Sequence, residues 1–170
     1  MKKVVRIIIN AGLLLSVSHY YIRHKKIKKK ELQYIKKEKR LKGYYDLLVQ
    51  WVYNLQNRNC LISYLKRNNI SNVAIYGMGN VAEILINELK GTDIKILYGI
   101  DQNSEKYIKP FIDIPVIKLH EVVKQEKADA IIVTPIFIYK DILKDIRKQG
   151  IDDTVISLED IVFNVKELEV

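Results

Sequence analysis

A glycine turn between an apolar run and a segment with helical spacing constrains this chain most. The apolar run Val73–Tyr76 stops at Gly77 and Gly79, and Val81–Leu89 then continues as a helix-like pattern. In the G-x-G-x-x-G/A fingerprint, Gly77 allows the tight turn, Gly79 lets backbone approach a diphosphate, and Ala82 keeps the helix close to its strand. The N–H groups at the start of such a helix attract anions. The pattern predicts a nucleotide-binding β-α-β unit.

A second apolar run ends in an acid at the place where ribose binds in such units. The run covers Ile94–Ile100, and Asp101 follows it, twenty-four residues after Gly77. An acid about 20 residues beyond the glycines accepts hydrogen bonds from ribose hydroxyls, and it favours a free 2′-hydroxyl. We therefore expect NAD or a nucleotide sugar as the ligand, rather than NADP.

The rest of the chain continues to alternate strand and helix patterns. Further strands are expected at Ile114–Ile117, Ala128–Thr134 and Thr154–Ser157, and helices at Leu119–Lys124, Ile138–Gln149 and from Leu158. This alternation predicts an α/β fold, a doubly wound parallel sheet of about five strands with right-handed crossovers. Because ligands bind at the carboxyl ends of such strands, Thr134-Pro135 is expected to line the binding site beside the base or sugar.

One ligand site is therefore predicted, at the carboxyl edge of the sheet. The turn and the helix start would cradle the diphosphate, and the acid would take the ribose. The predicted binding residues are Gly77, Met78, Gly79, Asn80, Val81, Asp101, Gln102, Thr134 and Pro135. Three scattered histidines and one cysteine predict no metal site.

Patterns for catalysis are missing. A short-chain dehydrogenase or epimerase needs a tyrosine with a lysine four residues on after the fourth strand, but only Tyr21 and Lys25 have this spacing. The phosphate loop G-x-x-x-x-G-K-[ST] is also missing. Tyr107, His120 and Tyr139 are the candidates if the chain is an enzyme that borrows groups from a partner. A ligand-free scaffold is a third reading, and the question of catalysis stays open.

Charge separates the chain into two parts. Residues 1–42 hold fourteen Lys/Arg against two acids, whereas residues 43–170 hold fifteen against eighteen. A nucleic-acid-binding fold would spread basic residues over a folded face, so we expect no nucleic acid partner. Cys60 is the only cysteine, which favours a reducing compartment.

The basic part begins with an apolar segment, Val4–Ile22. Nineteen helical residues span about 28 Å, close to the roughly 30 Å of a hydrocarbon core. We favour a single-span anchor; an interfacial helix, a signal peptide cleaved near Ser16-Val17-Ser18 and a buried helix are the alternatives. The lysines after the span predict a single-pass protein of the cell inner membrane with its globular domain in the cytoplasm.

A helical neck is expected between anchor and sheet. Glu31–Gln56 has the spacing of an amphipathic helix, and Leu61–Leu65 indicates a second short helix. The first helix either packs on its own sheet or forms a homodimer seam built on Trp51 and the tyrosines. The expected organisation is an anchor over 1–24, a basic neck over 25–70 and a nucleotide-binding domain over 71–170.

The segments Ile75–Gly79, Tyr98–Asn103, Ile114–Val116, Ala128–Val133 and Ile156–Leu158 together carry a family resemblance. From Ser71 to Val165 the chain resembles the Rossmann-like, NAD(P)-binding-like domain of membrane-anchored bacterial capsule and surface-polysaccharide proteins. There the domain precedes a nucleotide-sugar dehydratase/epimerase domain or belongs to a priming sugar-phosphate transferase. It is also similar to the nucleotide-sugar-binding half of sugar acyltransferases. The resemblance implies a membrane-tethered module that binds a nucleotide or nucleotide sugar and assists polysaccharide synthesis beside a glycosyltransferase or epimerase. The family's catalytic domain does not follow in this sequence, so complete catalysis by the chain alone is not expected.

Overall fold

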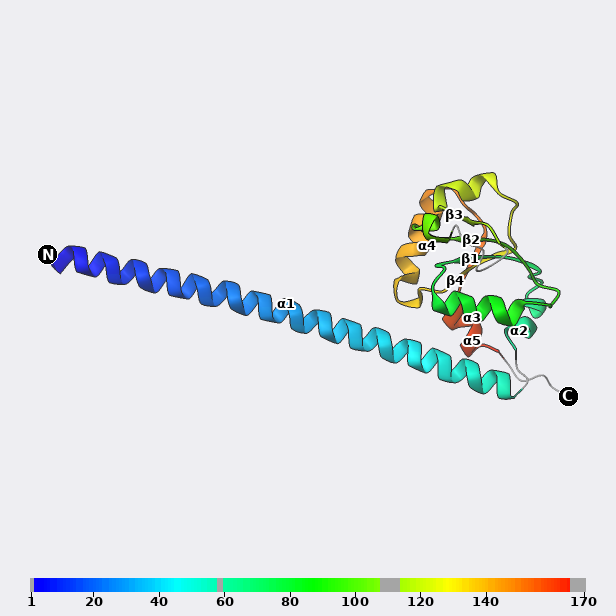
Figure 1. Ribbon diagram of the computed structural model, residues 1–170, viewed down its shortest axis with the longest axis horizontal. Helices are drawn as coiled ribbons and strands as arrows, with labels where there is room; N and C mark the ends of the chain where they lie inside the picture. The colour runs from blue at the N-terminus through cyan, green and yellow to red at the C-terminus, as the bar shows by residue number, and fades with distance from the viewer. Residues whose placement is uncertain (1, 58–59, 108–113, 166–170) are drawn as a thin grey trace. The chain divides into compact units, whose positions relative to one another are not determined.

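The computed structural model describes residues 2–57, 60–107 and 114–165; the side chains of residues 2, 4–15, 17, 106 and 107 lie outside this description. The chain divides into two compact units, Met1–Tyr45 and Asp46–Val170. Helix α1, Lys2–Gln56, forms the described part of the first unit and continues into the second (Figure 1).

Helix α1 is continuous where the sequence suggested an anchor followed by a neck. It spans 55 residues, and the first proline of the sequence comes only at position 110. Proline is the residue that most strongly breaks a helix, so nothing of this kind interrupts α1. Among the described residues, no helix is long and apolar enough to cross a membrane. Most side chains of the expected anchor, Val4–Ile22, lie outside the described ones.

The second unit is built on a parallel sheet. Its strands are β1 (Asn72–Tyr76), β2 (Lys95–Ile100), β3 (Val116–Ile117), β4 (Ala130–Val133) and β5 (Thr154–Ser157). Their order is β3-β2-β1-β4-β5, and all four pairings are parallel. The predicted five-stranded parallel sheet is confirmed. Strand order reverses between β1 and β4, which makes that point the topological switch.

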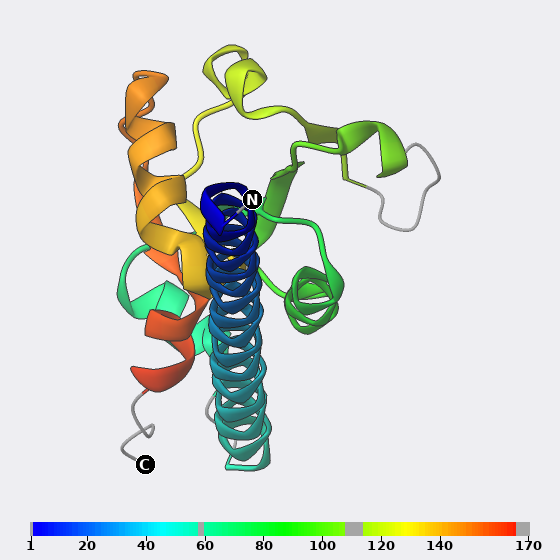
Figure 2. The same ribbon diagram turned by 90° about the vertical axis from the view of Figure 1, so that its left-hand side faces the viewer.

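Helices lie on both faces of this sheet. They are α2 (Leu61–Arg67), α3 (Asn80–Leu89), α4 (Tyr139–Lys148) and α5 (Leu158–Phe163), with 3₁₀ helices η1 (Ser104–Tyr107), η2 (Leu119–Lys124) and η3 (Ile136–Ile138). The two views of the ribbon place α3 and α4 on opposite sides of the sheet (Figures 1 and 2). Coverage of both faces explains why β1 and β4 are nearly continuous apolar runs.

Some element boundaries differ from the prediction. Strand β3 has only two residues, because Pro115 before it has no N–H to donate and only its carbonyl joins the ladder, accepting from the Gly99 N–H at 2.9 Å. The helix expected over Leu119–Lys124 is the 3₁₀ helix η2. The helix predicted over Ile138–Gln149 is α4, Tyr139–Lys148, and the 3₁₀ helix η3 precedes it.

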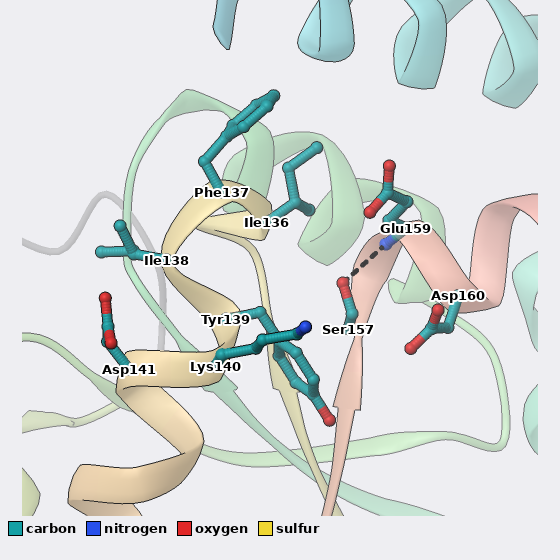
Figure 3. A pocket seen from close by; sticks show the side chains of 9 residues that line it. All are labelled: Ile136, Phe137, Ile138, Tyr139, Lys140, Asp141, Ser157, Glu159 and Asp160. Atoms are coloured by element: carbon teal, nitrogen blue, oxygen red, sulfur yellow. Dashed lines mark hydrogen bonds between the residues drawn. The ribbon is translucent and has the colours of Figure 1, made fainter. Parts of the chain in front are cut away.

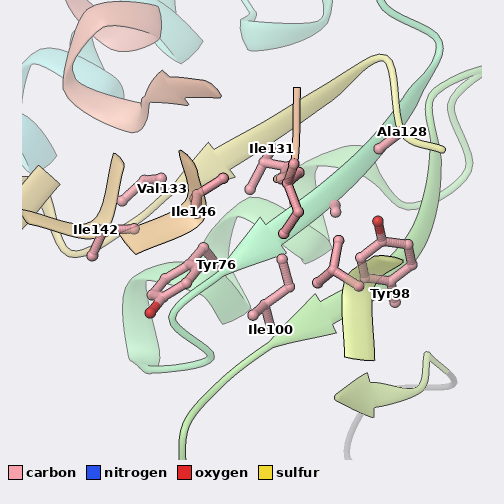
Figure 4. Close-up of a cluster of buried hydrophobic side chains, with 11 residues drawn as sticks. Tyr76, Tyr98, Ile100, Ala128, Ile131, Val133, Ile142 and Ile146 are labelled. Carbon is pink, nitrogen blue, oxygen red and sulfur yellow. The ribbon is translucent and has the colours of Figure 1, made fainter. Parts of the chain in front are cut away.

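The core on the α4 side is a cluster of buried side chains from β1, β2, β4, η2 and α4 (Figure 4). Its members are Ala74, Tyr76, Tyr98, Ile100, Val122, Ala128, Ile131, Val133, Ile142, Ile146 and Ile151. Alternate residues of each strand contribute, as side chains of a strand point to opposite faces in turn. Burial raises the pKa of Tyr76 and Tyr98, and the nearby charge of Asp153 adds to the effect at Tyr98.

The last turns of α1 belong to the second unit. Trp51 is 2% exposed, and its Nε1–H donates to Oε2 of Glu88 in α3 at 2.5 Å. The other oxygen, Glu88 Oε1, accepts from the Leu61 N–H at 3.0 Å, and Asn54 Nδ2 donates to the Val162 carbonyl at 2.7 Å. Trp51 therefore packs on its own domain. The part of the dimer prediction that used Trp51 is wrong, because a fully buried indole is not available to a second chain.

Candidate functional site

The glycine turn after β1 is closed from one side by the end of β4. Gly77 has a φ of +87°, and its N–H donates to the Ile100 carbonyl at 2.8 Å. A Cβ at Gly77 would lie 2.5 Å from Pro135 Cγ and 3.1 Å from Thr134 Oγ1. Both the backbone conformation and the lack of space require glycine here.

Thr134 fixes this contact by hydrogen bonds. It is 3% exposed; its hydroxyl oxygen lies 2.6 Å from the Gly77 carbonyl oxygen and 3.2 Å from that of Tyr76. Its N–H donates to the Tyr76 carbonyl at 3.0 Å. The hydroxyl proton is thus used within the protein. Thr134 and Pro135 were predicted to lie beside the base or sugar of the ligand. In the structure they pack against Gly77, and the Thr134 hydroxyl lies beside the Tyr76 and Gly77 carbonyls.

Met78 also packs inward. It is 5% exposed, and a Cβ at Gly99 in β2 would lie 2.5 Å from the Met78 sulfur. The Met78 thioether therefore fills the space beside Gly99, a residue of β2, the strand that pairs with β1. Met78 is part of the predicted site through its backbone, while its side chain belongs to the domain core.

Asp101 lies beside the turn, as the sequence predicts. Its Oδ2 accepts from the Met78 N–H at 3.0 Å and its Oδ1 from the Asn103 N–H at 2.8 Å. An ionised carboxylate has about four acceptor positions, so two bonds leave capacity for hydroxyl donors. The acid is half-buried and the next residue, Gln102, is exposed.

The start of α3 is the open part of the turn. Gly79 and Asn80 are exposed, and nothing lies within 4 Å of a Cβ placed on Gly79. Gly79 is the N-cap and no side chain caps the helix there. The first N–H groups of a helix have no acceptor within it and carry the positive end of the dipole, which favours an anion. Glu83 is the one acid in the first turn of α3, and its negative charge would weaken the attraction between the helix dipole and a bound anion.

A pocket of about 570 Å³ opens on the same edge, beyond β4 and β5 (Figure 3). It is lined by Ile136, Phe137, Ile138, Tyr139, Lys140, Asp141, Ser157, Glu159 and Asp160. Ser157 Oγ accepts from the Glu159 N–H at 3.3 Å, and the Tyr139 hydroxyl donates to the Val155 carbonyl at 2.9 Å. Burial raises the pKa of Tyr139, with a smaller contribution from the charge of Asp160.

The pocket lining has three acids against one lysine. Such a surface repels phosphate and accepts hydrogen bonds from hydroxyl groups. The sequence analysis named only Tyr139 among the pocket residues as a site candidate, for catalysis, and predicted none of them as binding residues. The signal for them was Ser157, which ends a predicted strand at the same carboxyl edge as Gly77 and Thr134.

In the described part of the chain, no hydrogen bond joins His120 to Tyr139, two of the three candidates for catalysis. His120 is exposed on η2, and the Tyr139 hydroxyl is engaged with backbone. The side chain of Tyr107 lies outside the described ones. Among the residues that the structure describes, no three His, Cys, Asp or Glu side chains lie close enough together to hold a metal ion.

Comparison with known proteins found one family model, described as C2185-like, N-terminal, which matches residues 69–157. A search of curated proteins and a search of solved structures each found no match. The matched range runs from just before β1 to the end of β5 and thus contains the whole sheet. It also covers just over half of the chain, and the chain therefore belongs to the C2185-like, N-terminal family.

Proposed function

We propose that this domain binds NAD or a nucleotide sugar at the carboxyl edge of its sheet. The observation that carries the proposal is the exposed, uncapped start of α3 beside a carboxylate with spare acceptor capacity. The diphosphate would lie on the N–H groups of Gly79, Asn80 and Val81, since these groups carry the positive end of the helix dipole. The adjacent ribose would donate to Asp101 near Gln102.

The pocket beyond β4 and β5 would take the other half of the ligand. A dinucleotide or nucleotide sugar extends to both sides of its diphosphate, and the turn lies between Asp101 and this pocket along the strand order. The carboxylates of Asp141, Glu159 and Asp160 suit a hydroxyl-rich, uncharged sugar. Gly77, Met78, Thr134 and Pro135 would act by holding the turn in shape.

The proposal extends to where the domain works. The apolar segment Val4–Ile22 and the lysines after it support a single-pass inner-membrane tether with the domain in the cytoplasm. The resemblance to capsule and surface-polysaccharide proteins supports a role beside a glycosyltransferase or epimerase. In this role the chain would present the nucleotide ligand, and its partner would supply the catalytic groups.

Thermal-shift measurements and isothermal titration with NAD and with nucleotide sugars test the binding. A ligand at about a hundred times its Kd stabilises the folded state by about 2.7 kcal/mol. Gly79→Glu adds a negative charge in open space at the helix start, so we expect it to abolish the shift without unfolding the domain. Asn87→Glu adds the same charge on an exposed position of the same helix and should keep the shift. No stabilisation of the unaltered protein at millimolar ligand would refute the proposal.

A further inference from the structure

The first unit carries an apolar strip that no other described part of that unit covers. Tyr20, Ile27, Tyr34 and Leu41 are 70%, 55%, 71% and 59% exposed. They follow one another at intervals of seven residues along α1. A helix in water gains most of its stability from packing an apolar face, so this strip calls for a partner.

A second line completes a heptad pattern. His24, Glu31, Glu38 and Tyr45 each follow a residue of the first line by four positions. Alternating steps of four and three residues place both lines on one side of a helix. The rings of Tyr20 and His24 stack with centroids 6.0 Å apart, which puts one residue of each line in contact. We call residues 20, 24, 27, 31, 34, 38, 41 and 45 the seam.

We propose that the seam is the contact between two copies of this chain, joined as a parallel two-stranded coiled coil over residues 20–45. A shallow groove already lies along it, lined by Tyr34, Lys37, Glu38, Leu41, Lys42 and Tyr45. Knobs from a second helix enter holes made by four such residues. The contact does not depend on nucleotide binding by the other unit.

Lysines beside the seam offset the charge of its two glutamates in a parallel pair. In heptad terms Glu31 and Glu38 occupy a positions, and Lys30 and Lys37 occupy the g positions directly before them. In a parallel dimer, an a residue packs beside the preceding g residue of the second helix. Glu31 would therefore meet Lys30 of the second copy, and Glu38 would meet its Lys37, and these contacts offset the repulsion between each glutamate and its equivalent in that copy. In an antiparallel pair the glutamates would face the apolar line instead.

The lysines argue against a membrane surface as the occupant of the seam. In the heptad frame, the basic residues from Arg23 to Lys42 occupy every position other than the two of the seam. A helix that lies on a bilayer keeps its polar residues on the side away from the apolar face. Here basic residues border the seam closely on both sides, as expected of positions that flank a coiled-coil interface.

Sedimentation of the full chain in nonionic detergent tests the proposal with a matched pair of variants. Leu41→Lys changes a seam residue, whereas Leu32→Lys changes a leucine of similar exposure, 53%, on the opposite side of the same helix. We expect Leu41→Lys to weaken dimerisation more than about tenfold, because two buried leucines are lost per dimer. Leu32→Lys should leave the dimer intact. A monomeric unaltered chain, or equal effects of the two changes, would overturn the proposal.

Charge exchange tests the orientation. Glu31→Lys with Glu38→Lys should dissociate the dimer, and adding Lys30→Glu with Lys37→Glu should restore it. Ile27→Cys in a Cys60→Ser background should form a disulfide between copies, because equivalent seam residues face each other only in the parallel pair. Failure of both rescue and cross-linking would refute the parallel coiled coil.

Salt distinguishes this contact from a lipid contact. The apolar contacts of the seam should keep the dimer together as salt rises from about 0.1 to about 0.5 M, whereas contact of lysines with anionic lipid weakens. Vesicles of phosphatidylcholine with phosphatidylserine serve as the probe. A seam that binds these vesicles as a monomer, and is released from them by Leu41→Lys, would count against the proposal.

Discussion

The backbone N–H of Met78 donates to Oδ2 of Asp101 at 3.0 Å, so the acid that follows β2 holds the glycine turn that follows β1. The other oxygen of the same carboxylate accepts from the Asn103 N–H at 2.8 Å. A residue predicted to bind ribose therefore also orders the backbone of the predicted diphosphate site. Structural and binding roles of Asp101 must be separated by experiment.

Asp101→Ala leaves two N–H groups without their acceptor. We expect it to lower the free energy of unfolding by about 1–3 kcal/mol, the usual loss for bonds to a charged group. Asp101→Asn keeps one acceptor oxygen, so its loss should be smaller. Urea unfolding of both variants measures the difference. If Asp101→Ala unfolds like the unaltered protein, the carboxylate does not order the turn.

Gly77 and Gly79 differ in their tolerance of a side chain. Gly77→Ala places a Cβ 2.5 Å from Pro135 Cγ at a φ of +87°, and we expect a loss of at least about 1–3 kcal/mol from backbone strain alone. Gly79→Ala is the matched control, since its Cβ meets nothing within 4 Å. Thermal unfolding of both variants compares them. Similar melting temperatures would contradict the close approach of Pro135.

Glu88 joins the end of α1 to α2 and α3. Trp51→Phe removes the donor to Glu88 Oε2 from a fully buried position, and we expect a loss of about 1–3 kcal/mol. Glu88→Gln removes one of the two acceptor oxygens and should cost a similar amount. Because the residues share one bond, the double variant should lose less than the sum of the single losses. Denaturation of all three variants gives this coupling, and strict additivity would refute the contact.

Asp129 gives stability a dependence on acid pH. Its Oδ2 accepts from the N–H groups of Asn72 and Ser71 at 2.7 and 2.9 Å, and these bonds hold the pKa of Asp129 below its ordinary value. The native state thus favours the ionised form. The contribution to stability is complete above the ordinary pKa of about 3.8 and is lost as pH falls through the lowered native value.

Asp129→Asn should remove this part of the pH dependence, so its free energy of unfolding should fall less steeply below pH of about 4. The change should be small, because the carboxylate is exposed. Asp152→Asn, at another exposed acid, serves as the control. Identical pH profiles of Asp129→Asn and the unaltered protein would contradict the assignment.

The membrane tether predicts a specific behaviour on extraction. The full chain should stay with the membrane fraction in high salt, whereas a fragment that starts at Lys42 should be soluble. The reason is that an apolar segment needs hydrocarbon, while contacts through lysines alone weaken as salt screens them. A reporter fused after Val170 should respond to the cytoplasm. Release of the full chain from the membrane by high salt would mean that the segment Val4–Ile22 only contacts the membrane surface and does not cross it.

Local sequence determined the order of elements in the second unit. Each strand is an apolar run, each connection contains a glycine, proline or polar stretch, and β5 has the predicted bounds Thr154–Ser157. Gly77 was predictable as the turn residue because its role depends on its own backbone conformation. Asp101 was predictable because strand length and the fingerprint place it beside the turn.

Tertiary structure decided what depends on residues far apart in the chain. The inward packing of Met78 depends on Gly99, and the loss of the Thr134 hydroxyl to internal bonding depends on the carbonyls of Tyr76 and Gly77. Trp51 has a helical spacing that fits either its own sheet or a second copy, and only the contact with Glu88, 37 residues away, distinguishes them. The spacing of apolar residues shows that one face of a helix must be buried. It does not show against what, because the hydrophobic effect has no direction and any complementary surface can bury that face. The partner of each face is therefore fixed only when the whole chain has packed.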